Sequence, residues 1–311
     1  MVCYSPITAW RGRFLTARGK RPLVFSRNKA LNPHVSTAVP CGQCVGCRLE
    51  YSRQWAVRCA HEMRLYDDNC FITLTYDEAH LLSPVTRGIP AWRRLSVNRR
   101  EMQLFMKRLR KRYGAGIRVF GCGEYGDKLG RPHYHALLFN HRFEDMKRWK
   151  QSSSGEMLYR SAELEKLWPF GFSSVGAATF QSAAYVARYM MKKVRGDLSQ
   201  KAYAPMCCPS TGEIMERSPE FAFQSQSLGK KWFQKFGSDV YPKDHVVMDT
   251  VPQKPPKFYD GLAEDIHEYH IERIKKARKR AALAKGEPLE RLRVRERVQE
   301  QRVALLARSV D

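Results

Sequence analysis

The chain has 311 residues, of which 43% are hydrophobic, enough for one large domain with a buried core. Its 55 Lys and Arg residues outnumber its 31 Asp and Glu residues, which gives a formal net charge of +24. Such an excess of positive charge favours a polyanionic partner, and nucleic acid is the first candidate. An anionic membrane surface is the second, but no segment has the roughly 20 uninterrupted apolar residues of a membrane-spanning helix.

The N-terminal residues contain no apolar signal region and no cleavage site, so the sequence predicts a cytoplasmic protein. Nine cysteines without a secretion signal argue against a disulfide framework. Three of them, Cys41, Cys44 and Cys47, have CxxCxxC spacing, which suggests a metal site instead.

The first half of the chain predicts two helices and a strand. Residues 1–47 are rich in Pro and Gly, and we expect irregular chain with short extended pieces. A helix should follow, because apolar residues recur at three- and four-residue spacing between residues 49 and 66. Residues 71–76, FITLTY, are β-branched and aromatic, as in a strand. A second helix is expected at residues 97–113, with Gly114 as its C-terminal cap.

The middle of the chain predicts a hairpin and two further helices. Residues 117–124 and 134–139 have strand character and are joined by a turn with two glycines, as in a β-hairpin with a longer loop. Residues 161–167 are expected to be helical. Residues 183–194 contain neither Gly nor Pro and predict another helix.

The C-terminal part differs in composition from the rest. Residues 251–257, VPQKPPK, predict a Pro-rich linker. From residue 266 to residue 308 the chain is rich in Arg, Lys, Glu, Ala and Leu, which predicts a long basic helix or a helix pair broken near residues 286–288. No Walker-type Gly-rich loop is present, so the sequence contains no sign of a helicase motor.

Two histidines stand in the segment RPHYHALLF. Because side chains alternate along a strand, His133 and His135 point to one face and Tyr134 to the other. Two neutral imidazoles side by side can bind one divalent metal, although two ordinary polar residues at the start of a strand would give the same pattern. Glu124 at the end of the preceding strand is the expected third ligand, with Asp127 as its competitor. A carboxylate with two imidazoles favours Mg²⁺ or Mn²⁺.

Two tyrosines follow in the segment AAYVARYMMKKV. Tyr185 and Tyr189 are four residues apart, so they share a helix face, and Lys192 lies one turn further on. A tyrosine hydroxyl has a pKa near 10 and needs help to attack a phosphodiester, which a metal or a lysine can give. Paired aromatic residues at this spacing also occur as ordinary packing. The charged neighbours, such as Arg188, argue against a wholly buried face.

Together these motifs resemble the HUH endonuclease superfamily, whose members have a first motif like FITLTYD, a His-hydrophobic-His motif and one or two helical tyrosines. The tyrosines follow the histidines, as in replication initiators and unlike relaxases. Five segments resemble the gokushovirus-type replication initiators of microphages (Microviridae): VPCGQCVGCR, LFMKRLRKR, GEYGDKLGRPHYHALLF, LWPFGFSSVG and AAYVARYMMKK. The resemblance covers most of residues 1–240, and the region after residue 257 matches no motif.

This resemblance implies an α+β fold with a central antiparallel sheet flanked by helices, the metal site on the sheet and the tyrosine helix opposite. We expect a nickase domain at residues 1–250, with a Cys-rich element at residues 1–47. The linker at 251–257 would then lead to a basic helical extension at 258–311.

The implied function is rolling-circle replication initiation by metal-dependent nicking and strand transfer. The implied catalytic residues are Tyr185, Tyr189 and Lys192, and His133, His135 and Glu124 are the expected ligands of Mg²⁺ or Mn²⁺. A 5′-phosphotyrosine would leave a free 3′-hydroxyl as a primer for the host polymerase. Expected partners are single-stranded DNA, phage origin DNA and host replication proteins such as helicase and polymerase, in the cytoplasm of a bacterial host and without a membrane. For DNA contact we expect the basic residues Arg108, Lys111, Arg131 and Lys193.

The clustered cysteines can aim three thiolates at one Zn²⁺, and a closed structural site needs a fourth ligand. Cys3 is our choice, because a metal would tie down the loose N-terminus. Cys59 fits the buried face of its helix and His61 lies off that face, so both rank lower. An iron–sulfur cluster is the alternative metal centre.

Two other functions compete with the nickase. A non-catalytic zinc-containing DNA-binding protein would account for the charge and the cysteines, but not for the HYH strand and the YxxxY helix. A two-tyrosine transposase of the same superfamily would share both motifs, and the microphage-like segments disfavour it.

Overall fold

The computed structural model describes residues 3–17, 19–82, 85–86, 89–90, 96–126, 130–152, 155–192, 203–207, 212, 214–215, 217–241, 243–284 and 286–305. The chain divides into two compact units. The first consists of Met1–Tyr51 and Arg278–Leu306, and the second of Ser52–Ala277 and Ala307–Asp311.

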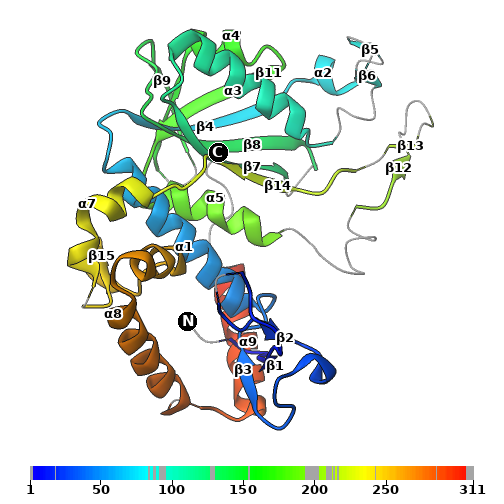
Figure 1. Cartoon of the computed structure of the whole chain (residues 1–311). Helices are drawn as coiled ribbons and strands as arrows, with labels where there is room; N and C mark the ends of the chain where they lie inside the picture. The colour runs from blue at the N-terminus through cyan, green and yellow to red at the C-terminus, as the bar shows by residue number, and fades with distance from the viewer. Residues whose placement is uncertain are drawn as a thin grey trace. The chain divides into compact units, whose positions relative to one another are not determined.

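The second unit is built on a seven-stranded sheet in which every neighbouring pair is antiparallel (Figure 1). Its strand order is β14-β7-β8-β4-β11-β10-β9. In that order the strands are Phe221–Gln224, Arg118–Tyr125, Pro132–Phe139, Asn69–Tyr76, Gly171–Ala177, Met157–Arg160 and Lys147–Gln151. Helices flank the sheet, which confirms the fold class predicted from the sequence.

Strand β4 explains why the sheet has two covered faces. Ile72 and Leu74 point to one face, where they pack with apolar residues of α3 (Arg99–Tyr113). Phe71 points to the other face, where it packs with α1 (Val45–Met63) and α5 (Phe180–Lys192). Alternation along a strand makes this division, and burial on both sides selects apolar residues in both rows. Helices α3 and α5 therefore lie on opposite faces of the sheet (Figure 1).

Helix α5 begins with a reciprocal cap. The Thr179 hydroxyl accepts a hydrogen bond from the Ser182 backbone N–H at 3.1 Å, and the Ser182 hydroxyl accepts one from the Thr179 backbone N–H at 2.8 Å. Two backbone donors that the helix leaves unpaired are thus satisfied. The cap fixes where α5 starts and hence which of its residues face β7 and β8, across which it packs.

Helices α7 (Lys230–Val240) and α8 (Lys257–Ala284) add a further apolar cluster to the second unit. Tyr259 near the start of α8 is fully buried in that cluster. The expected linker, residues 251–257, contains strand β16 (Val251–Gln253), which pairs with β15 (Val246–Met248). The compact units thus divide the chain at other positions than the expected domain boundaries, which stay a prediction.

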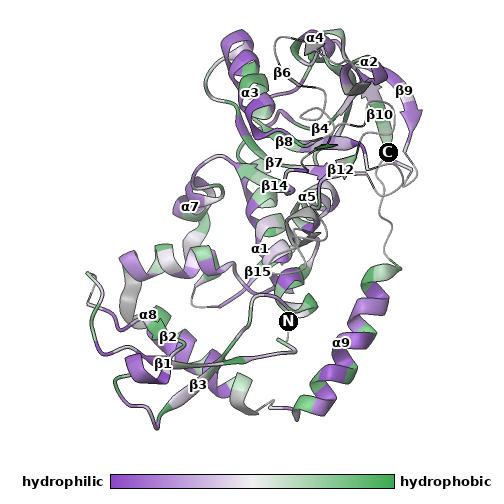
Figure 2. Ribbon diagram, turned by 90° about the vertical axis from the view of Figure 1, so that its right-hand side faces the viewer, coloured by the Kyte–Doolittle hydropathy of each residue, from purple (hydrophilic) through white to green (hydrophobic). Residues whose placement is uncertain are grey.

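The first unit holds a three-stranded antiparallel sheet in the order β2-β1-β3. Helix α9 (Leu289–Ala304) packs Leu292 into a small cluster with Tyr4 and Val45, and Figure 2 shows the helix as largely hydrophilic. The interruption between α8 and α9 falls where Gly286–Pro288 predicted it. The strands are β1 (Ile7–Arg11), β2 (Leu23–Val24) and β3 (Ser36–Val39), and a 3₁₀ turn covers Arg27–Lys29.

Short elements complete the described chain. They are α2 (Glu78–Leu82), β5 (Val85–Thr86), β6 (Ile89–Pro90), α4 (Ala162–Leu167), β12 (Met206–Cys207) and β13 (Ile214–Met215). Among the helices that the structure describes, none is both long and apolar enough to cross a bilayer.

Candidate active site

The face of the sheet beneath α5 changes character along its strands. Its apolar part contains Phe71, Phe120 and Leu137, which are buried with α1 and α5. Further along the same strands the row becomes polar. Glu124 pairs directly with His133 across β7 and β8, and His133 pairs with Thr75 across β8 and β4. The next row holds Cys122, His135 and Thr73.

Both histidines are oriented by threonines on the neighbouring strand. Thr73 Oγ1 lies 3.1 Å from His135 Nδ1, and Thr75 Oγ1 lies 3.0 Å from His133 Nδ1. When each Nδ1–H donates to its threonine oxygen, each Nε2 keeps a lone pair for a metal. The sequence analysis missed these threonines. Their signal was present in FITLTY, where the two Thr residues stand two apart on the face of the histidines.

Glu124 and His135 form a buried pair. Glu124 is 3% exposed and His135 is fully buried, with 3.0 Å between Glu124 Oε1 and His135 Nε2. A buried carboxylate is costly unless a cation or several donors compensate its charge. In octahedral coordination at about 2.1 Å, adjacent ligand atoms are about 3.0 Å apart, so this pair matches two neighbouring ligands of Mg²⁺ or Mn²⁺.

His133 stands farther out than that pair. Its ring centroid is 6.4 Å from that of His135, and its Nε2 lies against Gly126, where an added Cβ would meet it at 2.7 Å. Among the described residues, only the cysteine cluster below brings three or more such ligand atoms within 4.8 Å of one another. The His133 side chain must therefore turn toward Glu124 to complete a three-ligand site.

Tyr185 closes the site from the helix side. Its ring meets the His135 ring edge-on, with centroids 5.2 Å apart, and meets the Phe71 ring in the same manner at 6.3 Å. The side chain is 4% exposed, and the Arg188 guanidinium lies 5.9 Å from the ring centroid. The structure thus brings together Tyr185, His135 and Glu124 from three elements.

Other predicted residues of this region are only partly described. Tyr189 and Lys192 belong to α5, but their side chains lie outside the described residues, as do Lys193 and Asp127 entirely. Because Tyr189 follows Tyr185 by four residues in one helix, the two share a helix face.

A large aromatic residue lies on the same row as the site. Phe172 of β11 pairs with Thr75, so the row runs from Glu124 through His133 and Thr75 to Phe172. Its side chain is 55% exposed. An exposed ring next to a polar site offers a flat apolar surface to whatever binds there.

The four cysteines Cys3, Cys41, Cys44 and Cys47 form a second site in the first unit. All four Sγ atoms lie within 4.8 Å of one another, and neighbouring sulfurs are separated by 3.7, 3.9 and 4.0 Å. Tetrahedral Zn–S bonds of about 2.3 Å place sulfurs about 3.8 Å apart. The cluster can therefore hold a metal ion, and the sequence choice of Cys3 as fourth member agrees with the geometry.

Backbone donors surround these thiols. The Cys41 N–H points at Cys3 Sγ and the Cys44 N–H at Cys41 Sγ, each at 3.3 Å. Burial acts to raise the pKa of Cys41, but backbone N–H groups of Cys44 and Gln43 outweigh it and lower the pKa to about 7. Burial and the neighbouring thiols raise the pKa of Cys47. Four thiols this close cannot all ionise without a cation among them.

Comparison with known proteins decides the family. The chain is 34% identical to the replication-associated protein VP4 of Bdellovibrio phage phiMH2K over 277 residues, 86% of this chain and 78% of the relative. The chain belongs to the family of phage replication-associated proteins. Within this family it is 32% identical to the ORF2 protein of Spiroplasma virus 4, over 83% of this chain and 78% of the relative. The ORF4 protein of Chlamydia phage 1 is 28% identical over 73% of this chain and 54% of its own length.

The family model for the replication-associated protein ORF2 matches residues 69–194. That span runs from the start of β4 to just past the end of α5, so it contains the whole His–Glu–Tyr site. No solved structure matches the chain. The resemblance stated from the sequence motifs is confirmed at the level of the family.

The basic residues expected to contact DNA are not all near this site. Arg108 on α3 donates two hydrogen bonds to the Leu167 carbonyl, at 3.1 and 2.9 Å, and Lys111 is exposed on the same helix. Both lie on the sheet face opposite the histidines. Arg131 directly precedes β8, donates to the Tyr76 carbonyl at 3.2 Å and pairs with Glu78. Of the described members of this group, Arg131 is the one close to the His133 strand end.

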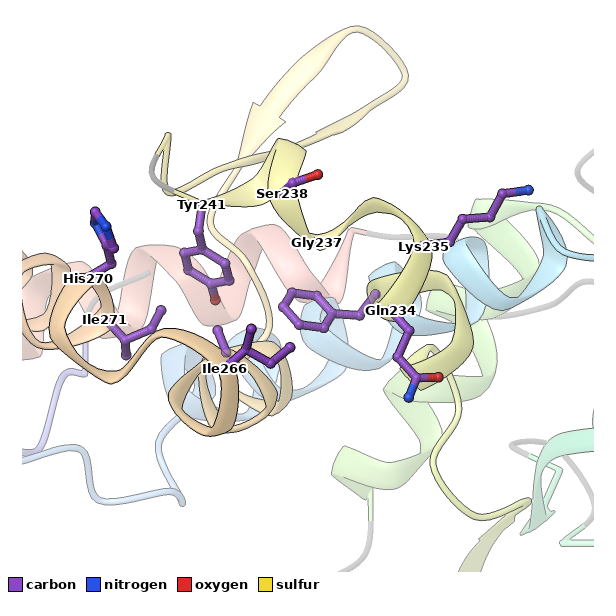
Figure 3. Close-up of a pocket in the computed structure, with 10 residues that line it drawn as sticks. Gln234, Lys235, Gly237, Ser238, Tyr241, Ile266, His270 and Ile271 are labelled. Atoms are coloured by element: carbon purple, nitrogen blue, oxygen red, sulfur yellow. The ribbon is translucent and has the colours of Figure 1, made fainter.

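A pocket of about 350 Å³ lies elsewhere in the second unit, between α7 and α8 (Figure 3). Phe233, Ala263 and Ile271 supply apolar lining, and Lys235 and His270 supply polar groups. It contains none of the residues predicted for catalysis or metal binding in this family member.

Proposed function

We propose that this protein initiates rolling-circle replication of phage DNA by nicking a single strand through a 5′-phosphotyrosine. The observation that carries the proposal is the contact between Tyr185 on α5 and His135 on β8. A tyrosine packed against a buried histidine–carboxylate pair is what a metal-assisted attack on phosphate requires. The relatives' names, which describe replication-associated proteins of phages, support the biological role.

His133, His135 and Glu124 are the proposed holders of one Mg²⁺ or Mn²⁺ ion. The 3.0 Å spacing of Glu124 and His135 and the threonine-bound Nδ1 atoms support this ligand set. A bound divalent ion withdraws charge from the non-bridging oxygens of the scissile phosphate. The chain's contribution is to bury the carboxylate, fix both imidazoles and hold the tyrosine helix over them.

The proposed step exchanges one phosphoester for another. The Tyr185 hydroxyl loses its proton and its oxygen attacks phosphorus, while the bond from phosphorus to the 3′ oxygen breaks and that oxygen takes up a proton. The 5′ end becomes linked to tyrosine and the 3′-hydroxyl is free to prime a host polymerase. Because the phosphoester energy is kept in the covalent link, strand rejoining needs no ATP.

Tyr189 has a proposed role in the second cut. After one circuit of replication the origin must be cut again while the first tyrosine is still occupied. A second tyrosine one helical turn away can do this without dissociation of the protein. Lys192, one further turn along α5, is proposed to stabilise negative charge on the reacting phosphate.

We further propose that the scissile strand lies over the polar row of the sheet. Phe172 supports this, since an exposed ring can stack an unpaired base. Arg131 and Lys193 are the proposed phosphate contacts near the site. Arg108 and Lys111 would contact DNA only on the opposite face of the sheet.

The four-cysteine cluster is proposed to hold a structural Zn²⁺. Its sulfur separations and its closed set of four ligands support a structural rather than a catalytic ion. Such an ion would tie the N-terminal segment to the start of α1.

Covalent capture tests the proposed function. The full chain would be incubated with Mn²⁺ and 3′-labelled single-stranded oligonucleotides, and denaturing electrophoresis would detect label that migrates with protein. We expect an adduct that forms with Mn²⁺, is absent with EDTA, and is absent from the double variant Tyr185→Phe, Tyr189→Phe, which still binds DNA. An adduct that is indifferent to both changes would overturn the proposal.

A further inference from the structure

The N-terminal segment has an unusual charge composition. Residues 1–49 contain no Asp or Glu, and Glu50 is the first acidic residue of the chain. The same segment contains eight basic residues: Arg11, Arg13, Arg18, Lys20, Arg21, Arg27, Lys29 and Arg48. Elsewhere the chain mixes both signs of charge, so this segment carries a concentrated share of the positive charge.

Several of these arginines are held in place by backbone carbonyls. Arg13 Nε donates to the Ala30 carbonyl at 2.9 Å, and Arg27 Nε donates to the Pro33 carbonyl at 3.2 Å. Arg11 Nη1 donates to the Arg21 carbonyl at 3.3 Å. A carbonyl orients a guanidinium without neutralising its charge, so the remaining N–H groups stay available for phosphate. All three side chains just described are exposed.

Two phenylalanines lie among these cations and are largely uncovered. Phe14, which follows Arg13, is 83% exposed, and Phe25, two residues before Arg27, is 62% exposed. β1 pairs with β2 through Arg11 and Leu23, so Phe14 follows one strand of this pair and Phe25 follows the other. Exposed aromatic surface of this extent marks a place where something binds.

We propose that this N-terminal surface, defined by Arg11, Arg13, Phe14, Phe25 and Arg27, binds single-stranded DNA. Cations interleaved with exposed rings fit a phosphate backbone whose bases are free to stack. In a duplex the bases already stack on one another, so the two rings would have no partner there. The absence of any carboxylate in residues 1–49 favours a polyanion over a protein partner of mixed charge, which would need acidic residues opposite its own cations.

The inference concerns binding and does not depend on nicking. It also does not depend on the polar row of the sheet, which belongs to the second unit. A protein that fails to nick can still show this binding, and a nickase can lack it, so the two proposals fail separately.

Fluorescence anisotropy with a labelled oligo(dT) of about 20 nucleotides and the full chain tests the proposal. Phe14→Ala with Phe25→Ala should weaken binding about tenfold or more, because stacking on an aromatic side chain contributes appreciably for each base. Phe14→Trp with Phe25→Trp keeps both rings and should bind like the parent chain. Arg13→Gln with Arg27→Gln should weaken binding and reduce its salt dependence.

The matched charge control is Lys230→Gln with Lys231→Gln, which removes two exposed cations at the start of α7. It should change oligo(dT) affinity less than the Arg13 and Arg27 pair does. A duplex of the same length should bind the Phe14, Phe25 alanine variant as it binds the parent chain. Unchanged oligo(dT) affinity in that variant, or an equal loss for duplex, would overturn the proposal. So would a loss of binding to vesicles containing anionic lipid without a loss of oligo(dT) binding.

Discussion

The ring of Tyr185 on α5 meets the ring of His135 on β8 edge-on, with their centroids 5.2 Å apart. The helix and the strand are far apart in the sequence, and the fold joins them because α5 packs across β7 and β8. This contact places a nucleophile beside a buried histidine–carboxylate pair. The following expectations test what the pair and its surroundings do.

Thr73→Val should weaken binding of Mn²⁺ about tenfold, because the oxygen that orients His135 Nδ1 would be lost while the side-chain shape is kept. Electron paramagnetic resonance of free Mn²⁺ during titration measures this affinity directly. Thr37→Val, at a half-buried strand position in the first unit, serves as the control and should leave it unchanged. Equal affinities for all three proteins would show that Thr73 does not position a ligand.

Gly126→Ala should also weaken Mn²⁺ binding, because the new methyl group would meet His133 Nε2 at 2.7 Å and displace the ring. Gly261→Ala places a methyl group in open space on α8 and is the matched control. That control should be neutral or slightly stabilising, because alanine favours a helix more than glycine does. Undiminished metal affinity in the Gly126 variant would remove His133 from the ligand set.

Cys41→Ser should release zinc and lower the melting temperature of the first unit while the covalent adduct still forms at low temperature. Elemental analysis gives the zinc content, and calorimetry shows which transition moves. Cys207→Ser, an exposed cysteine outside the cluster, should keep one zinc per chain. A parent chain that contains neither zinc nor iron after purification without added metal would end the idea of a structural ion.

His61 should make the protein less stable in mild acid. Burial lowers its pKa to about 3, whereas the unfolded chain titrates near 6.5. Between those values the unfolded state binds more protons, so the free energy of unfolding falls as pH falls from about 6.5, by up to about 1.4 kcal/mol per pH unit.

Denaturant unfolding at neutral pH and at two mildly acidic pH values measures that slope. His61→Gln lacks the titrating group and should show a shallower decline than the parent chain. His61 packs on Trp232 with 3.5 Å between centroids, so the variant will be less stable at every pH, and the comparison rests on slopes alone. Parallel slopes would show that His61 is not the acid-sensitive group.

Phe172→Ala should raise KM for a single-stranded oligonucleotide and change kcat less, if the exposed ring stacks a base beside the site. Phe172→Trp keeps a flat ring and should restore KM. Steady-state nicking of a labelled oligonucleotide provides both constants. A fall in kcat alone, with unchanged KM, would place the effect in the chemistry rather than in DNA binding.

Local periodicity predicted much of this molecule. The period of two along a strand placed His133 and His135 on one face, and the hairpin placed Glu124 next to them, where the register pairs it with His133. The helical period predicted α3, α5 and the broken C-terminal helices. The CxxCxxC spacing, with the loose N-terminus, pointed to the cysteine cluster that includes Cys3.

What the sequence did not disclose depends on contacts between distant segments. Thr73 and Thr75 gain their role because β4 lies beside β8, and strand order is set by long-range pairing rather than by local pattern. Arg108 looked like a DNA contact on a basic helix face, yet its guanidinium binds the Leu167 carbonyl. Tyr259 lies in a charged segment, but the packing of α8 on α7 buries it completely.

The most direct test of the central claim is mass spectrometry of the peptide linked to DNA after nicking. The adduct would be digested with protease and nuclease, and the residue that keeps a nucleotide would be identified by fragmentation. We expect the nucleotide on Tyr185 or Tyr189 of α5, and each single phenylalanine variant should move it to the other tyrosine. A nucleotide on any residue outside α5, or an adduct that persists when both tyrosines are replaced, would contradict the account.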